Sequence, residues 1–191
     1  MNTPAHILFG GALFGRPGQP KVTAAACFGG IAPDLSLYIM GGWSLYVLGI
    51  PPETVFRDLY FSPAWQQVFA IDNSFIIWGL GLGIALWAKA PAAIAFAAAG
   101  LLHLALDFPF HTDDARMHFW PLTTWRFESP VSYWDGRAYG NQVGAVALAL
   151  AVAATIWVWR RFRSWTMRIG ALLLLAMEAS VSGMWRLFFA G

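Results

Sequence analysis

Charged residues are scarce in this chain of 191 residues. Asp, Glu, Lys and Arg make up 12% of it and hydrophobic residues 58%, whereas about a quarter of a soluble domain is charged. This balance argues against a water-soluble enzyme and indicates a chain whose solvent is mostly lipid. The net charge of +2 is explained by membrane orientation, so we expect no nucleic-acid partner.

Cysteine is nearly absent as well. The single residue, Cys27, excludes an internal disulfide and any zinc cluster built on cysteine thiolates. A metal ion in this protein must therefore be held by His, Asp and Glu side chains, and the chain has four His residues.

Long apolar runs, by contrast, fill most of the sequence. A helical membrane span needs about 20 residues, and the main apolar runs are 22–48, 74–87, 92–110, 143–159 and 169–190. Residues 4–14 predict a further helix that is too short to span and is either steeply buried or re-entrant. The sequence therefore predicts an all-α fold, a polytopic transmembrane helical bundle of five long spans plus a short N-terminal helix. We expect one integral-membrane domain over residues 1–191.

Basic residues concentrate in three short connections, at 15–21, just after residue 87 and at 160–168. Alternating spans place all three on one side of the membrane, and the positive-inside rule assigns that side to the cytoplasm. The external segments, about 51–72 and 111–142, then face the periplasm or the exterior.

Ionisable residues within the apolar runs are the sharpest functional signal, because such groups are costly in lipid and usually face a cavity or a partner. His103 and Asp107 are four residues apart, which puts them on one helix face about one turn apart. This spacing suits two ligands of one metal ion, and it equally suits a buried hydrogen-bonded pair that joins two helices. Glu178, in the last run, is best interpreted as a protonated helix-packing group.

Two more residues extend the candidate site. Asp34 follows Pro33, which interrupts a span, and such a break is tolerated where protein or a cavity satisfies the freed backbone groups. With the first helix included, the candidate metal ligands are His6, Asp34, His103 and Asp107. Oxygen and imidazole donors suit a divalent metal, with zinc expected before manganese or iron. His111 is a weaker candidate because it lies two turns from His103 and follows Pro109.

Polar residues also gather just after the third long run. Residues 111–120 include two His, two Asp and one Arg, which a solvated loop would explain. The functional interpretation is a lid beside the metal, in which Arg116 binds an anionic substrate group. The candidates for catalytic proton transfer are then Asp113, Asp114 and His118.

Three short motifs carry a resemblance. They are His6 in the first helix, Pro33-Asp34-Leu35-Ser36, and His103-Leu104-Ala105-Leu106-Asp107 followed by His118-Phe119-Trp120-Pro121. Together they resemble the YdjM-like family of membrane-bound, metal-dependent hydrolases, which is distantly similar to zinc phospholipases C and single-strand-specific zinc nucleases. The resemblance implies a helical membrane protein with a metal site, located in the bacterial inner (cytoplasmic) membrane.

The chain also departs from the family pattern. Ser36 stands where the PDxD motif has its second Asp, and residues 69–74 occupy the place of the HRGxTHS motif without its two histidines. At least three of the family's potential ligands are therefore missing. The resemblance implies a single-metal site rather than one with two or three metal ions.

Two functions from different classes follow. In the first, a single-metal, hydrolase-like site faces the outer leaflet or periplasm, where metal-activated water attacks a phosphoester or lipid ester. In the second, the chain is a non-catalytic assembly or scaffold protein that retains a structural His/Asp cluster and docks a membrane-protein partner through its aromatic segment 119–134. A transporter fits less well because no inverted repeats are visible. Both functions place the chain in contact with the lipid bilayer, and the sequence leaves open whether it is an enzyme.

Overall fold

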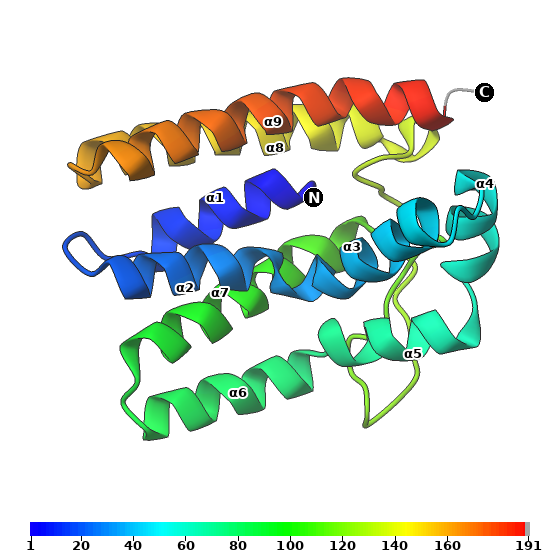
Figure 1. The fold of residues 1–191 in the computed structure, drawn as a ribbon, viewed down its shortest axis with the longest axis horizontal. Coiled ribbons are helices and arrows are strands. Elements are labelled where there is room, and N and C mark those ends of the chain that lie inside the picture. Colours follow the sequence, from blue (N-terminus) through cyan, green and yellow to red (C-terminus); the bar gives the residue numbers. More distant parts are fainter. Residues whose placement is uncertain (190–191) are drawn as a thin grey trace.

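Helices and helical turns form the regular structure of the part of the chain that the computed structural model describes, which is residues 1–189 for the backbone and 1–180 for the side chains. In Figure 1 the long helices lie side by side, roughly along the long axis of the molecule. In order, the elements are α1 (Thr3–Phe14), α2 (Pro20–Ile31), η1 (Ala32–Asp34), α3 (Leu35–Gly42), η2 (Trp43–Val47), α4 (Pro52–Thr54), η3 (Val55–Leu59), α5 (Pro63–Asp72), α6 (Phe75–Trp87), α7 (Pro91–Asp107), η4 (Phe108–Phe110), η5 (Gly136–Ala138), α8 (Gly140–Arg161) and α9 (Trp165–Phe189).

Proline starts many of these helices. It occupies one of the first two positions of α1, α2, α4, α5 and α7. Its fixed φ suits a helix start, and the N–H that it lacks would have no intrahelical partner there. Pro33, inside the first long apolar run, breaks that run into α2 and α3 through the 3-10 turn η1. This is the interruption that the sequence predicts.

Four helical segments are long and apolar enough to cross a membrane: Pro20–Val47, Pro63–Trp87, Pro91–Phe110 and Gly140–Arg161. They confirm the all-helical fold and its membrane character, and they match four of the five predicted spans. The fifth, 169–190, falls on α9 and extends beyond the side chains that the structure describes.

The second span begins earlier than the sequence predicts. Residues 51–72 are expected to be external, but Pro63–Asp72 forms α5 and belongs to a candidate span. Polar residues lower the hydropathy of this stretch, yet two of them are hydrogen-bonded to backbone carbonyls inside the protein. Gln66 is buried, and its amide donates to the Tyr60 carbonyl oxygen at 2.7 Å. Asn73 is buried and donates to two backbone carbonyls.

The short helix α1 lies inside the bundle. It contacts α2, α7, α8 and α9, and its side chains Leu8, Phe9 and Ala12 are buried. Because so many neighbours surround it, α1 is the steeply buried helix that its apolar sequence and short length predict. It therefore brings its own polar residues into the interior.

Two adjacent glycines bring α2 against both α7 and α1. A Cβ on Gly29 would clash with the carbonyl oxygen of Phe96 in α7, and a Cβ on Gly30 would clash with that of His6 in α1. Small residues let membrane helices approach at backbone distance. The same approach places the peptide group of Gly30 beside the polar residues of α7.

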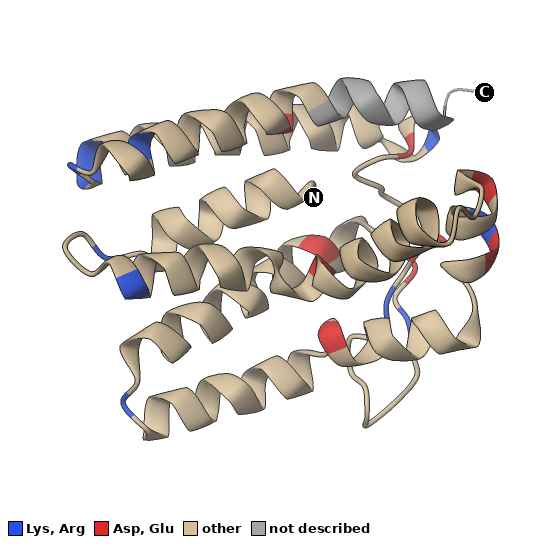
Figure 2. Ribbon diagram, viewed as in Figure 1, with Lys and Arg blue, Asp and Glu red and all other residues tan. Residues whose placement is uncertain are grey.

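The two ends of the bundle differ in charge. Figure 2 shows the three connections that are predicted to be cytoplasmic at one end, at the left of the view, with basic residues in each. The long connection after η4 lies towards the other end, together with α4 and the acidic residues around it. The alternation of spans that the sequence predicts therefore agrees with the arrangement of the helices.

Replacing Gly30 by alanine should destabilise the protein by about 1–3 kcal/mol, because the added methyl group must displace the backbone of α1. Gly79→Ala is the matched control: Gly79 lies within α6, and a Cβ there would meet open space. Thermal unfolding of detergent-purified protein should show a Tm lower by about 3–10 °C for Gly30→Ala alone. Equal Tm values for the two variants would contradict the close packing of α1 on α2.

Candidate metal centre

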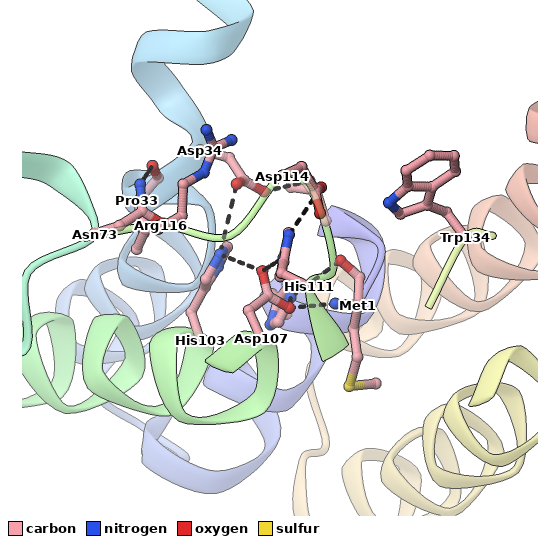
Figure 3. Close-up of polar contacts among 12 residues, drawn as sticks. Met1, Pro33, Asp34, Asn73, His103, Asp107, His111, Asp114, Arg116 and Trp134 are labelled. Carbon is pink, nitrogen blue, oxygen red and sulfur yellow. Dashed lines mark hydrogen bonds and ion pairs between the residues drawn. The ribbon is translucent and has the colours of Figure 1, made fainter. Parts of the chain in front are cut away.

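The last turn of α7 carries two of the predicted metal ligands on one face. His103 Nε2 lies 3.3 Å from Asp107 Oδ2. Both residues are buried, with 1% and 6% of their surface exposed, because α7 packs against α1 and α2. Figure 3 shows both side chains directed towards Asp34 and His111. The four-residue spacing therefore produces the shared face that the sequence predicts.

A backbone carbonyl fixes the orientation of His103. Its Nδ1 lies 2.8 Å from the carbonyl oxygen of Gly30, which only accepts, so Nδ1 donates. The neutral ring then has its lone pair on Nε2, and this buried nitrogen has no hydrogen-bond partner among the described residues. It faces two carboxylate oxygens instead, Asp107 Oδ2 and, at 3.5 Å, Asp34 Oδ1. A proton on Nε2, or a metal ion bound between these groups, would stabilise the arrangement.

His6 brings α1 into the same group. Its Nε2 lies 2.9 Å from Asp107 Oδ1, and its ring stacks on that of His103 with centroids 3.7 Å apart. His6, His103 and Asp107 each present a donor atom within 4.8 Å of the other two. The α-amino group of Met1 also donates to Asp107. Three of the four predicted ligands therefore form one buried triad.

Asp34, the fourth predicted ligand, sits at the edge of this triad. It ends the 3-10 turn η1, and its Oδ2 accepts a 2.6 Å hydrogen bond from the hydroxyl of Thr3. The Thr3 hydroxyl is itself 2.7 Å from that of Tyr38. The Asp34 side chain is 21% exposed, compared with 8% or less for the triad. Asp34 therefore marks the side from which solvent can reach the cluster.

His111 also joins the site, although the sequence makes it a weaker candidate. The 3-10 turn η4 bends the chain back after α7, so His111 Nε2 lies 3.4 Å from Asp107 Oδ2. On the other side of the ring, Nδ1 donates to Asp114 Oδ2 at 2.9 Å. Burial alone would lower the pKa of His111, but its contacts with Asp107 and Asp114 outweigh burial and raise it.

Asp114, one of the predicted proton-transfer residues, acts in this geometry through His111. Burial would raise the pKa of the Asp114 carboxyl, but its contact with His111 outweighs burial and lowers the pKa. An ionised carboxylate that accepts from the outer nitrogen of a histidine orients the ring and makes it more basic. Asp113, by contrast, is exposed, and its Oδ1 accepts from its neighbour Thr112. The structure does not bring Asp113 to the cluster.

Arg116, predicted to bind an anion, is buried with 7% of its surface exposed. Its guanidinium carbon lies 4.3 Å from the ring centre of Phe69 and 4.8 Å from that of Tyr60. Burial raises the pKa of Tyr60 to about 12, against the opposing effect of Arg116, so Tyr60 stays neutral. In the described part of the chain, Nη1 of Arg116 has no hydrogen-bond partner. A buried guanidinium with one unbonded nitrogen is suited to an anionic group.

His118 lies in an aromatic pocket beside these residues. Its ring centroid is 5.4 Å from that of Phe75 and 5.2 Å from that of Phe108. Nδ1 donates to the Arg116 carbonyl oxygen at 3.1 Å, while Nε2 is buried and unpartnered within residues 1–180. Burial lowers the pKa of His118 to about 4, so the ring is neutral at pH 7 and is a weak base.

Sequence reasoning missed the groups that hold the ligands in place. Thr3 orients Asp34, and the Gly30 carbonyl orients His103. Thr3 stands three residues before His6, on the same helix face, which is a signal that the sequence offered. A backbone carbonyl group cannot be recognised from the residue type. The only related signal is the Gly29-Gly30 pair, which permits the close approach of α2 to α1 and α7.

No family model, curated protein or solved structure matches the chain. The resemblance to the YdjM-like hydrolases therefore stays a prediction. The geometry around Asp107 defines the candidate site, and the apolar helices give the chain its membrane character.

The neutral state of His118 predicts a loss of stability in mild acid. The pKa is about 4 in the folded protein and about 6.5 in the unfolded chain. As the pH falls through this window, only the unfolded chain gains a proton, so stability is present above about pH 6.5 and is lost towards pH 4. His118→Gln should remove about 2 kcal/mol of the loss between pH 7.5 and 5, measured by unfolding at each pH. Equal acid sensitivity of the variant and the wild type would contradict this assignment; the neighbouring groups His111, Asp107 and Arg116 are present in both.

Proposed function

We propose that the chain is an integral-membrane metal-dependent hydrolase with a single-metal site that acts on a phosphoester or lipid ester from the outer-leaflet or periplasmic side. The proposed ligands are His6, Asp34, His103 and Asp107. The observation that carries the proposal is the environment of His103 Nε2. This buried nitrogen lies across the ring from the Gly30 hydrogen bond and faces the carboxylates of Asp34 and Asp107, so a cation bound there would be stabilised by both.

The distances between the donor atoms fit a divalent ion. Two ligands of one tetrahedral zinc ion, each bound at about 2.1 Å, lie about 3.4 Å apart. His103 Nε2 is 3.3 Å from Asp107 Oδ2 and 3.5 Å from Asp34 Oδ1, and neither pair meets the geometry of a hydrogen bond. His6 Nε2 donates to Asp107, so as a ligand His6 must move its proton to Nδ1, which has no partner within the described residues.

A divalent ion in this group would supply Lewis-acid activation of water for ester hydrolysis. Other residues of the chain would hold the ligands of this ion in position. Thr3 orients Asp34, the Gly30 carbonyl orients His103, and the Asp114–His111 pair supports Asp107. Three of the four proposed ligands, Asp34, His103 and Asp107, are thus held by an outer hydrogen bond or ion pair, as metal ligands are in other proteins.

Arg116 is placed to bind an anionic substrate in the proposed reaction. Its buried, incompletely bonded guanidinium lies in the same connection as His111 and Asp114. His118, neutral at pH 7 and with a free Nε2, is the nearby group that can accept a proton or a hydrogen bond. These two residues, and not Asp113, are the candidates for contact with substrate in the proposed reaction.

A non-catalytic role of the same cluster is the second candidate. The triad joins α1 to α7, and His103 joins α7 to α2, so the cluster can serve as a structural joint in an assembly or scaffold protein. The scaffold function requires the contacts between helices but neither a metal ion nor a substrate. Metal content therefore separates the two candidates.

Elemental analysis of detergent-purified protein tests the metal site. The wild type should hold about one divalent ion per chain after exposure to zinc. Asp107→Asn should hold at least about tenfold less, because it lacks the negative charge of the carboxylate around which the other proposed ligands gather. Asp58→Asn, on an exposed carboxylate in η3, is the control and should keep the metal. Helicity and monodispersity show that each variant is folded. If the folded wild type holds no metal, the proposed hydrolase function is wrong and the scaffold function remains.

Arg116→Gln should lower kcat/KM for a chromogenic phosphodiester by about 10- to 100-fold, because a charge-assisted hydrogen bond is lost in a buried site. Metal content and the hydrolysis of a neutral carboxylic ester should change little. Arg126→Gln, in the same external connection, is the matched control for net charge. An equal loss on both substrates would mean that Arg116 supports folding and not anion binding.

A further inference from the structure

The end of the bundle that lies away from the metal centre is strongly basic. Seven of the twelve Lys and Arg residues stand in the three connections there: Arg16, Lys21, Lys89, Arg160, Arg161, Arg163 and Arg168. None of the ten acidic residues falls in these connections, and Figure 2 shows the described acidic residues elsewhere in the molecule. The positive charge at this end is therefore not neutralised within the protein.

A pocket opens within this basic end. It has a volume of about 340 Å³ and lies between the α1–α2 turn and the α8–α9 turn. The residues that line it are Pro17, Gly18, Arg161, Phe162, Arg163 and Ser164. Two arginines and a serine thus line one space, and Gly18 contributes backbone without a side chain.

The arginines at this end play different parts. The Arg168 guanidinium already has partners within the protein. It donates hydrogen bonds to the carbonyl oxygens of Phe162 and Trp159 at 2.8 and 3.0 Å, which caps the C-terminal end of α8. Arg161 donates once, to the Ala12 carbonyl at 2.8 Å, which anchors its guanidinium at the pocket wall. Arg163 is exposed, and the described residues offer its side chain no hydrogen bond or ion pair. The pocket therefore has one anchored and one free guanidinium.

The surroundings are those of a lipid–water interface. Leu13 at the end of α1 and Trp165 at the start of α9 are 56% and 64% exposed, so the pocket is flanked by apolar side chains at the level where four candidate spans end. Tryptophan prefers the headgroup level of a bilayer. A ligand there can place an anionic group between the arginines while its apolar part stays in the membrane.

We propose that this pocket binds the phosphate of an anionic phospholipid from the leaflet on the basic side, taken to be the cytoplasmic one. Arginine recognises phosphate through paired, charge-assisted hydrogen bonds, and basic pockets at the ends of membrane helices select anionic headgroups. The proposal depends on membrane insertion but not on the metal centre, which lies in the other half of the bundle.

Native mass spectrometry of the detergent-purified full chain tests the site, with dioleoylphosphatidylglycerol and dioleoylphosphatidylcholine as the two probes. The wild type should retain one phosphatidylglycerol more tightly than phosphatidylcholine. Arg163→Gln should weaken the retention of phosphatidylglycerol about fivefold. Arg160→Gln removes the same charge from the same connection but from outside the pocket, and its effect should stay within about twofold.

Three results would overturn the proposal. Equal retention of the two lipids would mean that the site does not distinguish an anionic headgroup from a zwitterionic one. Equal effects of Arg163→Gln and Arg160→Gln would mean a diffuse basic surface and no pocket. Displacement of the lipid by glycerol phosphate at the same concentration would mean that the ligand is a soluble phosphate compound. Metal content should be unchanged in both variants, so failure of this site is distinguishable from failure of the metal centre.

Discussion

The buried carboxylate of Asp107 is the group on which the packing around the centre depends. An isolated carboxylate in apolar surroundings costs several kcal/mol, so it persists only where other charges and donors surround it. His6 reaches it from α1, His103 from the same helix and His111 from the following connection. Two other segments, α1 and the connection after η4, are therefore brought to one turn of α7. The short helix α1, which cannot span a bilayer, gains a fixed depth from this contact as well as from its apolar packing.

The pattern of outer hydrogen bonds around the cluster resembles that of metal centres. A cluster that only joined helices would be most stable with every buried nitrogen bonded. Here His103 donates from Nδ1 to the Gly30 carbonyl, and its Nε2, which has no hydrogen-bond partner among the described residues, faces two carboxylates. Three carboxylate or imidazole groups each have an outer partner, Thr3 for Asp34, Gly30 for His103 and Asp114 for His111. This is how metal ligands are oriented in proteins.

Much of this could be predicted from sequence because it depends on local periodicity. Apolar runs predict the helices, the spacing of His103 and Asp107 predicts their shared face, and Pro33 predicts the break that exposes Asp34. The rest depends on tertiary contacts. The start of α5 is missed because the polar Gln66 finds a partner that hydropathy cannot anticipate. His111 is undervalued because the turn after Pro109 folds it back towards Asp107, and helix geometry alone cannot give that direction.

The distribution of charge makes the two ends of the bundle different. The basic connections lie at one end, and the carboxylates of the centre lie in the other half of the molecule. On that side the buried carboxylates are matched by imidazoles, which leaves Arg116 as a buried cation with an unbonded nitrogen. An anionic substrate approaching from the external side would thus meet a guanidinium before it reached the carboxylates. An anion on the other side would meet Arg161 and Arg163 instead. In the two proposals the ends of the bundle bind anions in different roles: Arg116 would bind an anionic substrate beside the centre, and the basic connections would orient the protein in the membrane.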